Sequence, residues 1–504
     1  MAIERLRFCV DGEWKETSSG KYMPITDSST GQVIAEAPCC TVGEVESAIE
    51  AAARAFPEWS GTPVPKRSQL MFSFKAILEQ HLEELTVMVS TELGKNLDEA
   101  RGDVLKAIEV VEYACAVPVT MQGYSLMNVS QGFDTVLYRE PIGVFAGIVP
   151  FNFPAMIPFG WMIPLCITTG NTFVLKASSQ TPLTAVRMLE LLQQAGLPKG
   201  VVNLVTCSRN EAELLLSHPK VAGVSYVGST KTGRTIFAKA SSNGKRVQVL
   251  GEAKNHGLVL RDANLDQAAR AIVNSSFGCA GMRCMALPTI AVEEQCADEF
   301  VSLFVKYASE RRVGCAYKPD TELGPVVSAE HKQAVLDWIE TGIREGASLV
   351  LDGRNTSVPG YEAGFFIGPT IFDHVKSGMR IGDEEIFGPV ACIKRVKGFE
   401  EGLAIMNASP YANGSCIFTE SGHYAREFAK RTHAGMVGIN VGIPVPISVF
   451  PFSGHKNSFL GDLHVMGKDG IAFYTEAKSV TSRWFGSTTA SRPVSTWEGT
   501  ITRG

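Results

Sequence analysis

The chain has 504 residues, of which 45% are hydrophobic and 20% charged, and its formal net charge is -5. At roughly 100–200 residues per domain, this length predicts two to four globular domains with large buried cores. The chain has no basic excess and no block of like charge, which argues against nucleic acid or a membrane surface as a partner.

The N-terminal part of the chain, before the strands predicted from residue 143 onward, is predicted to be mainly helical. Thr41 and Glu44 form a capping box that opens an amphipathic helix over 41–59. Two further helices are expected over 66–90 and 97–116. Residues 123–140 are expected to form an extended hairpin.

No charged residue occurs between Glu140 and Lys176, a stretch long enough to cross a membrane. Prolines from Pro141 to Pro164 interrupt it repeatedly, and a continuous membrane helix would bend badly there. We therefore expect a buried strand, turn and helix, and no membrane segment.

Strand-like and helical segments alternate from 143 to 252, which predicts right-handed crossovers, a parallel sheet and a doubly wound, dinucleotide-type domain. The expected strands are 143–149, 172–176, 201–205, 223–227 and 246–250, and the expected helices are 155–168, 181–195, 210–217 and 230–241. A second α/β domain is predicted from strands at 257–260, 287–292, 348–351, 389–395, 415–418 and 437–440 and helices near 264–277, 296–309, 328–345 and 398–406.

The twelve cysteines contain no CxxC pair and no spacing typical of metal ligands, so no metal site is predicted. Most are expected to be small buried hydrophobic residues in a reducing compartment, the cytoplasm. The N-terminus has no apolar signal-peptide core, and its acidic residues argue against a transit peptide.

Two glycine-containing segments suggest sites. No GxGxxG fingerprint is present, and the nearest feature is the segment 228–233 (GSTKTG), which follows a predicted strand. This segment is equally compatible with a phosphate held by free N–H groups at a helix start and with a tight strand-to-helix turn.

The second segment, 277–284 (FGCAGMRC), places small residues that allow close backbone approach directly before a cysteine. A nucleophilic thiol needs access and a positive local field to ionise, and Arg283 would supply part of that field for Cys284. Cys279 is the competing candidate. The segment 384–390 (EEIFGPV) by itself indicates only a helix end followed by a strand. The residues alone thus predict an α/β protein with a candidate thiol site.

Five segments resemble those of the aldehyde dehydrogenase superfamily in order and spacing, and the resemblance covers residues 10–485. They are 150–154 (PFNFP), 170–176 (GNTFVLK), 226–229 (YVGS), 281–284 (GMRC) and 384–389 (EEIFGP). Within the superfamily the chain is most similar to the CoA-acylating methylmalonate-semialdehyde (malonate-semialdehyde) dehydrogenases. The segments that carry this closer resemblance are 139–144 (REPIGV), 253–256 (AKNH), 283–287 (RCMAL), 452–454 (FSG) and 468–475 (KDGIAFYT).

The resemblance implies roles for individual residues. Cys284 would attack the aldehyde carbon, and the Asn152 amide and the Cys284 backbone N–H would form the oxyanion hole. Loss of hydride to NAD would leave a thioester on Cys284. The implied cofactor-binding residues are Val149, Phe151, Lys176, Ser179, Gln180, Ser229, Gly251, Glu385 and Phe387.

One departure from the family pattern concerns the base that activates water. Hydrolytic members begin the segment at 250–254 with a glutamate, and this chain has Leu250 there. Water needs that base more than a thiol does, so the change favours deacylation by coenzyme A. Glu252 is either a displaced base or a local structural carboxylate, and we favour the structural interpretation.

Two further departures concern specificity. The subfamily usually has glutamate and arginine where this chain has Ser179 and Gln180, and without the acidic residue NADP becomes an alternative to NAD. Lys106 stands where an arginine would hold the substrate carboxylate together with Arg283. Lysine cannot make a bidentate fork, so a less acidic aldehyde is an alternative substrate. Lys106 is equally compatible with a solvated charge on a helix face.

The sequence therefore predicts an α/β, aldehyde dehydrogenase-like fold. Its expected parts are a Rossmann-type NAD(P)-binding domain (1–122 and 141–255), a catalytic thiol domain (256–440), a small β oligomerisation element (123–140 and 470–486) and a tail (487–504). The expected reaction converts a (methyl)malonate-type semialdehyde and CoA to propanoyl-CoA or acetyl-CoA with release of CO2, in a homotetramer built as a dimer of dimers. The alternatives are a hydrolytic NAD(P)-dependent aldehyde dehydrogenase that releases a free acid and a non-catalytic protein that keeps the fold.

Overall fold

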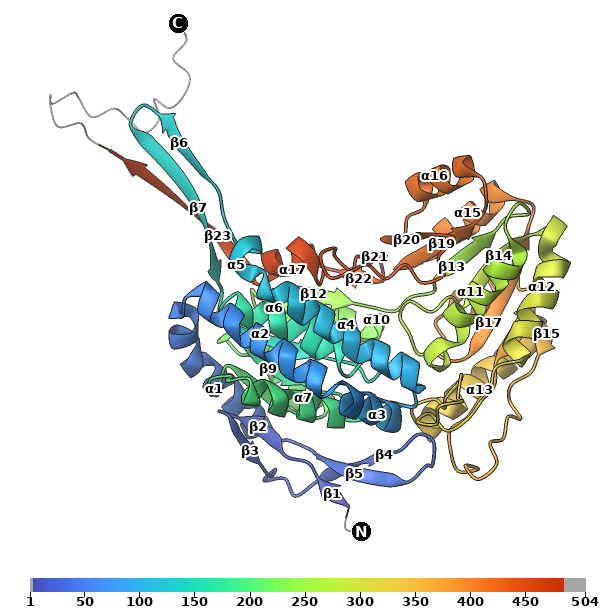
Figure 1. Ribbon diagram of the computed structural model, residues 1–504, viewed down its shortest axis with the longest axis horizontal. Helices are drawn as coiled ribbons and strands as arrows, with labels where there is room; N and C mark the ends of the chain where they lie inside the picture. Colours follow the sequence, from blue (N-terminus) through green and yellow to red (C-terminus); the bar gives the residue numbers. More distant parts are fainter. Residues whose placement is uncertain (1–2, 485–504) are drawn as a thin grey trace, which may run out of the picture.

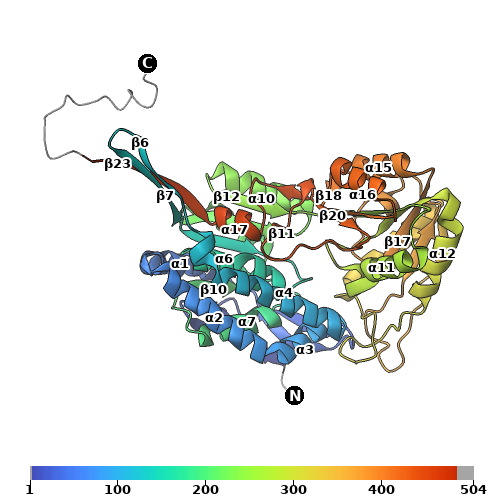
Figure 2. The same ribbon diagram turned by 45° about the horizontal axis from the view of Figure 1, so that its top comes forward.

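The computed structural model describes residues 3–484. Two lobes, each built on a large sheet, carry a three-stranded arm that projects from the first lobe (Figure 1). The arm also points away from both lobes in Figure 2. Within the described range, no helix combines the length and the apolar character needed to cross a membrane.

The first lobe contains an eight-stranded sheet with the order β22-β12-β11-β8-β9-β10-β2-β3. Its parallel centre, as predicted, consists of β8 (Val144–Ile148), β9 (Thr172–Lys176), β10 (Val202–Val205), β11 (Val221–Val227) and β12 (Arg246–Leu250). Antiparallel edges are added by β2 (Phe8–Val10), β3 (Glu13–Lys15) and β22 (Phe459–Leu460). The strand order reverses between the neighbours β8 and β11, and such a switch point is where doubly wound sheets bind ligands.

The helices of this lobe confirm most of the predicted pattern. They are α1 (Val42–Gly61), α2 (Val64–Gln80), α3 (Leu82–Leu93), α4 (Leu97–Cys115), α5 (Val117–Thr120), the π-helix η1 (Ile157–Met162), α6 (Ile163–Thr168), α7 (Leu183–Gln194), α8 (Arg209–Ala212), α9 (Leu214–Ser217) and α10 (Thr230–Ser242). The capping box of Thr41 and Glu44 is present. The uncharged stretch forms a strand, a turn and helical segments, as expected.

One predicted helix, 66–90, is wrong because the structure divides it into α2 and α3. The break is at His81, whose backbone (φ -100°, ψ 13°) lies outside the helical region. The His81 ring lies 2.6 Å from the Glu84 carboxylate in the first turn of α3, an interaction that stabilises the new helix start.

The second lobe contains a seven-stranded sheet with the order β15-β16-β17-β14-β13-β19-β20, in which only β15 is antiparallel to its neighbour. Its strands are β13 (His256–Val259), β14 (Thr289–Glu293), β15 (Ser348–Leu351), β16 (Thr370–Asp373), β17 (Val390–Val396), β19 (Gly414–Phe418) and β20 (Met436–Ile439). Its helices are α11 (Leu265–Phe277), α12 (Glu294–Ser309), α13 (Ala329–Arg344), α14 (Arg380–Asp383), α15 (Phe399–Ala408) and α16 (Gly422–Arg431). The sequence did not predict β16 or α16.

The arm consists of β6 (Ser125–Ser130), β7 (Phe133–Pro141) and β23 (Thr475–Arg483), and β23 pairs with β7 along its whole length. The predicted hairpin is therefore confirmed. The expected C-terminal strand starts later than 470, because the helix α17 (Gly467–Phe473) precedes it. The predicted tail, 487–504, lies outside the described residues, and the domain boundaries stay a prediction.

Smaller elements complete the fold. A three-stranded sheet at the N-terminal side contains β1 (Glu4–Arg5), β5 (Val33–Pro38) and β4 (Tyr22–Thr26). The short strands β18 (Tyr411–Ala412) and β21 (His455–Lys456) pair near the second lobe.

A buried amide joins the arm to the first sheet. The Asn171 side chain accepts hydrogen bonds from the backbone N–H groups of Ile142 (2.7 Å) and Gly143 (3.0 Å), where β7 leads into β8. Its Nδ2 donates to the carbonyl of Tyr474 (2.7 Å), directly before β23. One side chain thus holds β7 and β23 together at the base of the arm.

We expect Asn171→Ala to lower the free energy of unfolding by about 3 kcal/mol or more, since it leaves several buried backbone groups without partners. Asn243→Ala is the matched control, because the Asn243 side chain is exposed and makes one bond to Lys239. Denaturant and thermal unfolding of both variants measure the difference. Equal stability of the two variants would show that Asn171 does not hold this junction.

Candidate active site

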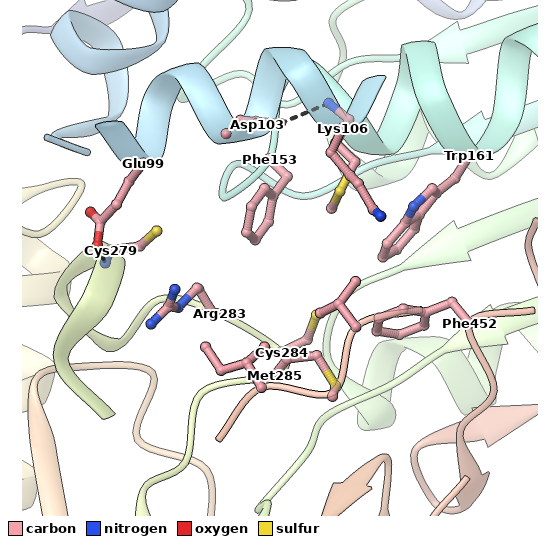
Figure 3. A pocket seen from close by; sticks show the side chains of 14 residues that line it. Glu99, Asp103, Lys106, Phe153, Trp161, Cys279, Arg283, Cys284, Met285 and Phe452 are labelled. Carbon is pink, nitrogen blue, oxygen red and sulfur yellow. Dashed lines mark hydrogen bonds between the residues drawn. The ribbon is translucent and has the colours of Figure 1, made fainter. Parts of the chain in front are cut away.

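A cavity of about 350 Å³ lies between helices of the first lobe and a loop of the second (Figure 3). The helices α4 and η1 form one wall, and the loop after α11 forms the other. Both candidate cysteines line this cavity. Cys284 is partly exposed, whereas Cys279 is only 4% exposed, so access favours Cys284 as the reactive thiol.

The loop reaches the cavity through a left-handed turn. Cys279 and Ala280 have φ values of 52° and 50°, and Gly281 has a φ of 73°. A Cβ atom on Gly281 would lie 2.0 Å from the carbonyl oxygen of Gly388, so only glycine fits there. This contact packs the thiol loop against the segment 384–389, which the sequence associated with the same site.

The backbone of Cys284 is held by two amide side chains. Asn255 Nδ2 donates to the Cys284 carbonyl at 2.8 Å and to the Ala286 carbonyl at 2.7 Å. Asn413 Nδ2 donates to the Cys284 carbonyl at 3.1 Å. In the sequence, Asn255 stood out only as part of a family signature and Asn413 did not stand out at all, because their shared target becomes visible only in three dimensions.

Asn152 lies beside the same loop. Its Nδ2 donates to the carbonyl of Met282 at 3.1 Å, which leaves the second N–H of the amide free. Its Oδ1 is buried and has no hydrogen-bond partner among the described residues. The fold therefore brings Asn152 to the backbone that carries Cys284, as an oxyanion hole would require.

The resting thiol is neutral. Burial, with a smaller contribution from the Glu385 carboxylate, raises the pKa of Cys284 to about 12, although Arg283 acts in the opposite direction. Glu385 is itself protonated more easily than a free glutamate, since burial and the neighbouring Glu252 raise its pKa to about 8. Cys284 therefore needs an added positive charge or a proton acceptor before it can act as a nucleophile.

A second cavity, of about 370 Å³, lies where β8, β9 and β11 end. Ile148, Leu216 and Ile236 give it apolar walls. The Lys176 ammonium makes no hydrogen bond or ion pair that involves another described residue, and burial lowers its pKa. A largely apolar slot with a half-buried, unpartnered lysine at the switch point fits a nucleotide whose hydroxyl or phosphate oxygens accept from that lysine.

The other predicted cofactor residues fall into three groups. Phe151 and Phe387 lie together, with ring centroids 5.9 Å apart and planes at 89°, and Val149 is buried just before them. Ser229 is exposed and caps the start of α10. Gly251 donates its N–H to the Ser458 carbonyl at 2.9 Å, so β22 covers this glycine.

Ser179 and Gln180 are not brought to the Lys176 cavity. Ser179 lines a separate cavity together with Cys207 and Glu211, and the Gln180 side chain is exposed. The turn after β9 carries both residues past the end of the strand, which sequence spacing alone did not reveal.

Glu252 is bound to the start of α10. Its Oε2 accepts a hydrogen bond from the Thr230 N–H at 3.2 Å, and its own N–H donates to Thr230 Oγ1 at 2.9 Å. A carboxylate at a helix N-terminus is stabilised by the helix dipole. These contacts support the structural interpretation of Glu252 over a displaced base.

Lys106 and Arg283 line the thiol cavity from opposite walls. The Lys106 side chain is 19% exposed, so it is not a solvated charge on a helix face. Its Nζ lies 2.8 Å from Glu109 Oε2 and 3.0 Å from the Pro446 carbonyl. Arg283 donates through Nη2 to the Asn274 carbonyl at 2.5 Å.

The chain is similar to known proteins over most of its length. The family model described as "Aldehyde dehydrogenase family" matches residues 14–480. The chain is 47% identical to malonate-semialdehyde dehydrogenase 2 of Bacillus thuringiensis (strain Al Hakam), over 94% of this chain and 97% of the relative.

Two solved structures are similar over nearly the whole chain. One is a methylmalonate-semialdehyde dehydrogenase from Oceanimonas doudoroffii, with a TM-score of 0.94, 40% identity, and coverage of 96% of this chain and 99% of that one. The other, from Sinorhizobium meliloti 1021, is assigned to the same activity and is complexed with NAD. It has a TM-score of 0.94, 39% identity and the same coverage.

Alkylation by iodoacetamide tests which thiol is accessible and how it titrates. We expect Cys284 to react before Cys279, and its rate to rise about tenfold per pH unit between pH 7 and pH 10, because its raised pKa keeps the thiol mostly protonated throughout that range. Trypsin cleaves after Arg283 and separates the two cysteines for mass spectrometry. Earlier labelling of Cys279, or a rate that levels off below pH 8, would contradict this account.

Proposed function

The chain belongs to the aldehyde dehydrogenase family, and from this premise we propose that it oxidises a malonate- or methylmalonate-type semialdehyde to an acyl-CoA through a thioester on Cys284. NAD is the proposed hydride acceptor. The names of the similar proteins and the NAD complex of one of them support this proposal.

The chemistry begins at Cys284. Its thiolate attacks the aldehyde carbon, and the free N–H of Asn152 and the Cys284 backbone N–H stabilise the alkoxide that forms. When bound, NAD would supply the hydride acceptor, and loss of hydride from this adduct would leave a thioester on the sulfur of Cys284. Coenzyme A then attacks the thioester carbonyl, and Cys284 leaves as thiolate. A malonate-type substrate loses its carboxyl group as CO2 during turnover.

One observation favours CoA over water as the second nucleophile. The end of β12, beside the site, offers no residue that is ready to act as a base. Leu250 occupies the family position of the base and is 5% exposed. Glu252 is bound to the start of α10, two residues further on. A thiol with a pKa of ~8.5 is partly ionised near neutral pH and needs this help less than water does.

Glu385 supports the alternative, a hydrolytic enzyme that releases a free acid. Its carboxyl group accepts from the Ala253 N–H at 2.9 Å and has a pKa of about 8, a value suited to a general base. We assign Glu385 instead to the nicotinamide ribose, with Phe151 and Phe387 beside the ring. Lys176 would hold the adenosine end, where NADP is the alternative cofactor.

We also propose assembly into a homotetramer through the arm. Apolar side chains stay exposed on or beside its strands, including Tyr124 (75%), Leu126 (64%), Met127 (79%) and Tyr138 (51%). Exposed apolar strands of this kind are usually covered by another subunit. The domain boundaries given above and a cytoplasmic location belong to the same proposal.

Initial rates of NADH formation with malonate semialdehyde test this proposal. We expect steady turnover only when CoA is present, because Cys284 stays acylated without it. Brisk turnover without CoA would favour the hydrolytic alternative, and loss of that turnover in Glu385→Gln with unchanged binding of NAD would identify its base.

Two cysteine variants provide the matched controls. Cys284→Ala is expected to lose roughly a thousandfold or more in turnover, because no nucleophile remains. Cys279→Ala is expected to keep activity close to that of the unmodified enzyme. Loss of turnover in Cys279→Ala with activity retained in Cys284→Ala would instead identify Cys279 as the nucleophile.

A further inference from the structure

Two buried donors of the thiol cavity have no acceptor among the described residues. The indole Nε1 of Trp161 belongs to a side chain that is 1% exposed, and the Nε of Arg283 is likewise buried and unpartnered. Both residues line the cavity that holds Cys284. Buried donors are nearly always paired, so two unpaired donors on one cavity indicate a ligand that carries acceptor atoms.

The Trp161 indole is held in one orientation. It packs on the Phe452 ring, with centroids 4.6 Å apart. The neighbouring Gly160 lets η1 pack directly on α4, since a Cβ there would lie 3.2 Å from the Cα of Ala107. Figure 3 shows the indole nitrogen on the side of the ring that faces the ammonium of Lys106.

Lys106 alone is a weak anchor for a substrate carboxylate. Its ammonium donates to Glu109 and to the Pro446 carbonyl, so one N–H remains. The Glu109 carboxylate, which also accepts from the Ser448 N–H at 2.6 Å, offsets much of its charge. A further donor is therefore needed on this wall of the cavity.

We propose that Trp161 determines specificity by donating its indole N–H to the carboxylate of the semialdehyde, beside the remaining N–H of Lys106. This inference rests on the proposed function. Arg283 Nε is the donor on the opposite wall. The rest of the lining is largely apolar and includes Phe153, Met156 and Val445, and in such surroundings a hydrogen bond to a carboxylate is strong.

Trp161→Phe removes the N–H and keeps an aromatic ring against Phe452. We expect kcat/KM for malonate semialdehyde to fall about tenfold or more, mainly through a higher KM, because a hydrogen bond to a charged group is lost. Propanal has the same carbon chain without the carboxylate, and its kcat/KM is expected to change less than about twofold. Equal losses for both aldehydes, or no loss for either, would overturn the proposal.

Two further variants separate recognition from packing. Trp161→His returns a ring N–H and is expected to recover part of the preference for the acidic aldehyde. Trp14→Phe removes an indole donor that is bonded to Gln193 Oε1, away from the cavity, and is expected to leave the preference unchanged. A preference that does not recover in Trp161→His and also falls in Trp14→Phe would overturn the assignment to Trp161.

Binding of malonate, which cannot react, makes this test independent of turnover. Calorimetry without NAD or CoA is expected to show binding to the unmodified enzyme and at least tenfold weaker binding to Trp161→Phe. This result would stand even if the CoA-dependent reaction failed. Malonate that does not bind the unmodified enzyme, or binds both proteins equally, would refute the role of Trp161.

Discussion

The hydrogen bonds from Asn255 and Asn413 to the carbonyl oxygen of Cys284 are the constraint on which the site depends. A loop that contains successive left-handed residues would be poorly defined without such partners. The two amides fix the loop from the second lobe, and the close contact of Gly281 with Gly388 fixes it from the segment that carries Glu385 and Phe387. The thiol therefore faces the first lobe, where Asn152 and the walls of the cavity are located.

The burial of Cys284 in this cavity affects both the ionisation of its thiol and the strength of the hydrogen bonds around it. Burial that raises the pKa of Cys284 keeps most of the thiol protonated near neutral pH. The same low-dielectric surroundings strengthen the hydrogen bonds that an alkoxide or a carboxylate would receive. In the proposed reaction, Leu250 replaces the carboxylate that would activate water, so the thioester would remain available to a thiol.

The regular α/β core could be predicted because its hydrophobic segments follow strand and helix periods. The π-helix η1, the break at His81 and the short polar elements such as α16 could not, since tertiary contacts determine them. In the site, the family motifs indicated Cys284, Asn152 and Glu385. No sequence signal pointed to Trp161, because it lies in an uncharged apolar run that resembles core. The proposed role of Trp161 depends on its position beside Lys106 and across the cavity from Arg283, and both residues are distant from it in sequence.

The most direct test of the central claim is mass spectrometry of tryptic peptides after the enzyme has reacted with malonate semialdehyde and NAD without CoA. We expect fragment ions to place an acyl group on Cys284, and we expect that group to disappear once CoA is added, with acyl-CoA released in equal amount. An acyl group on Cys279, or no acyl group on any cysteine while NADH accumulates, would contradict the account.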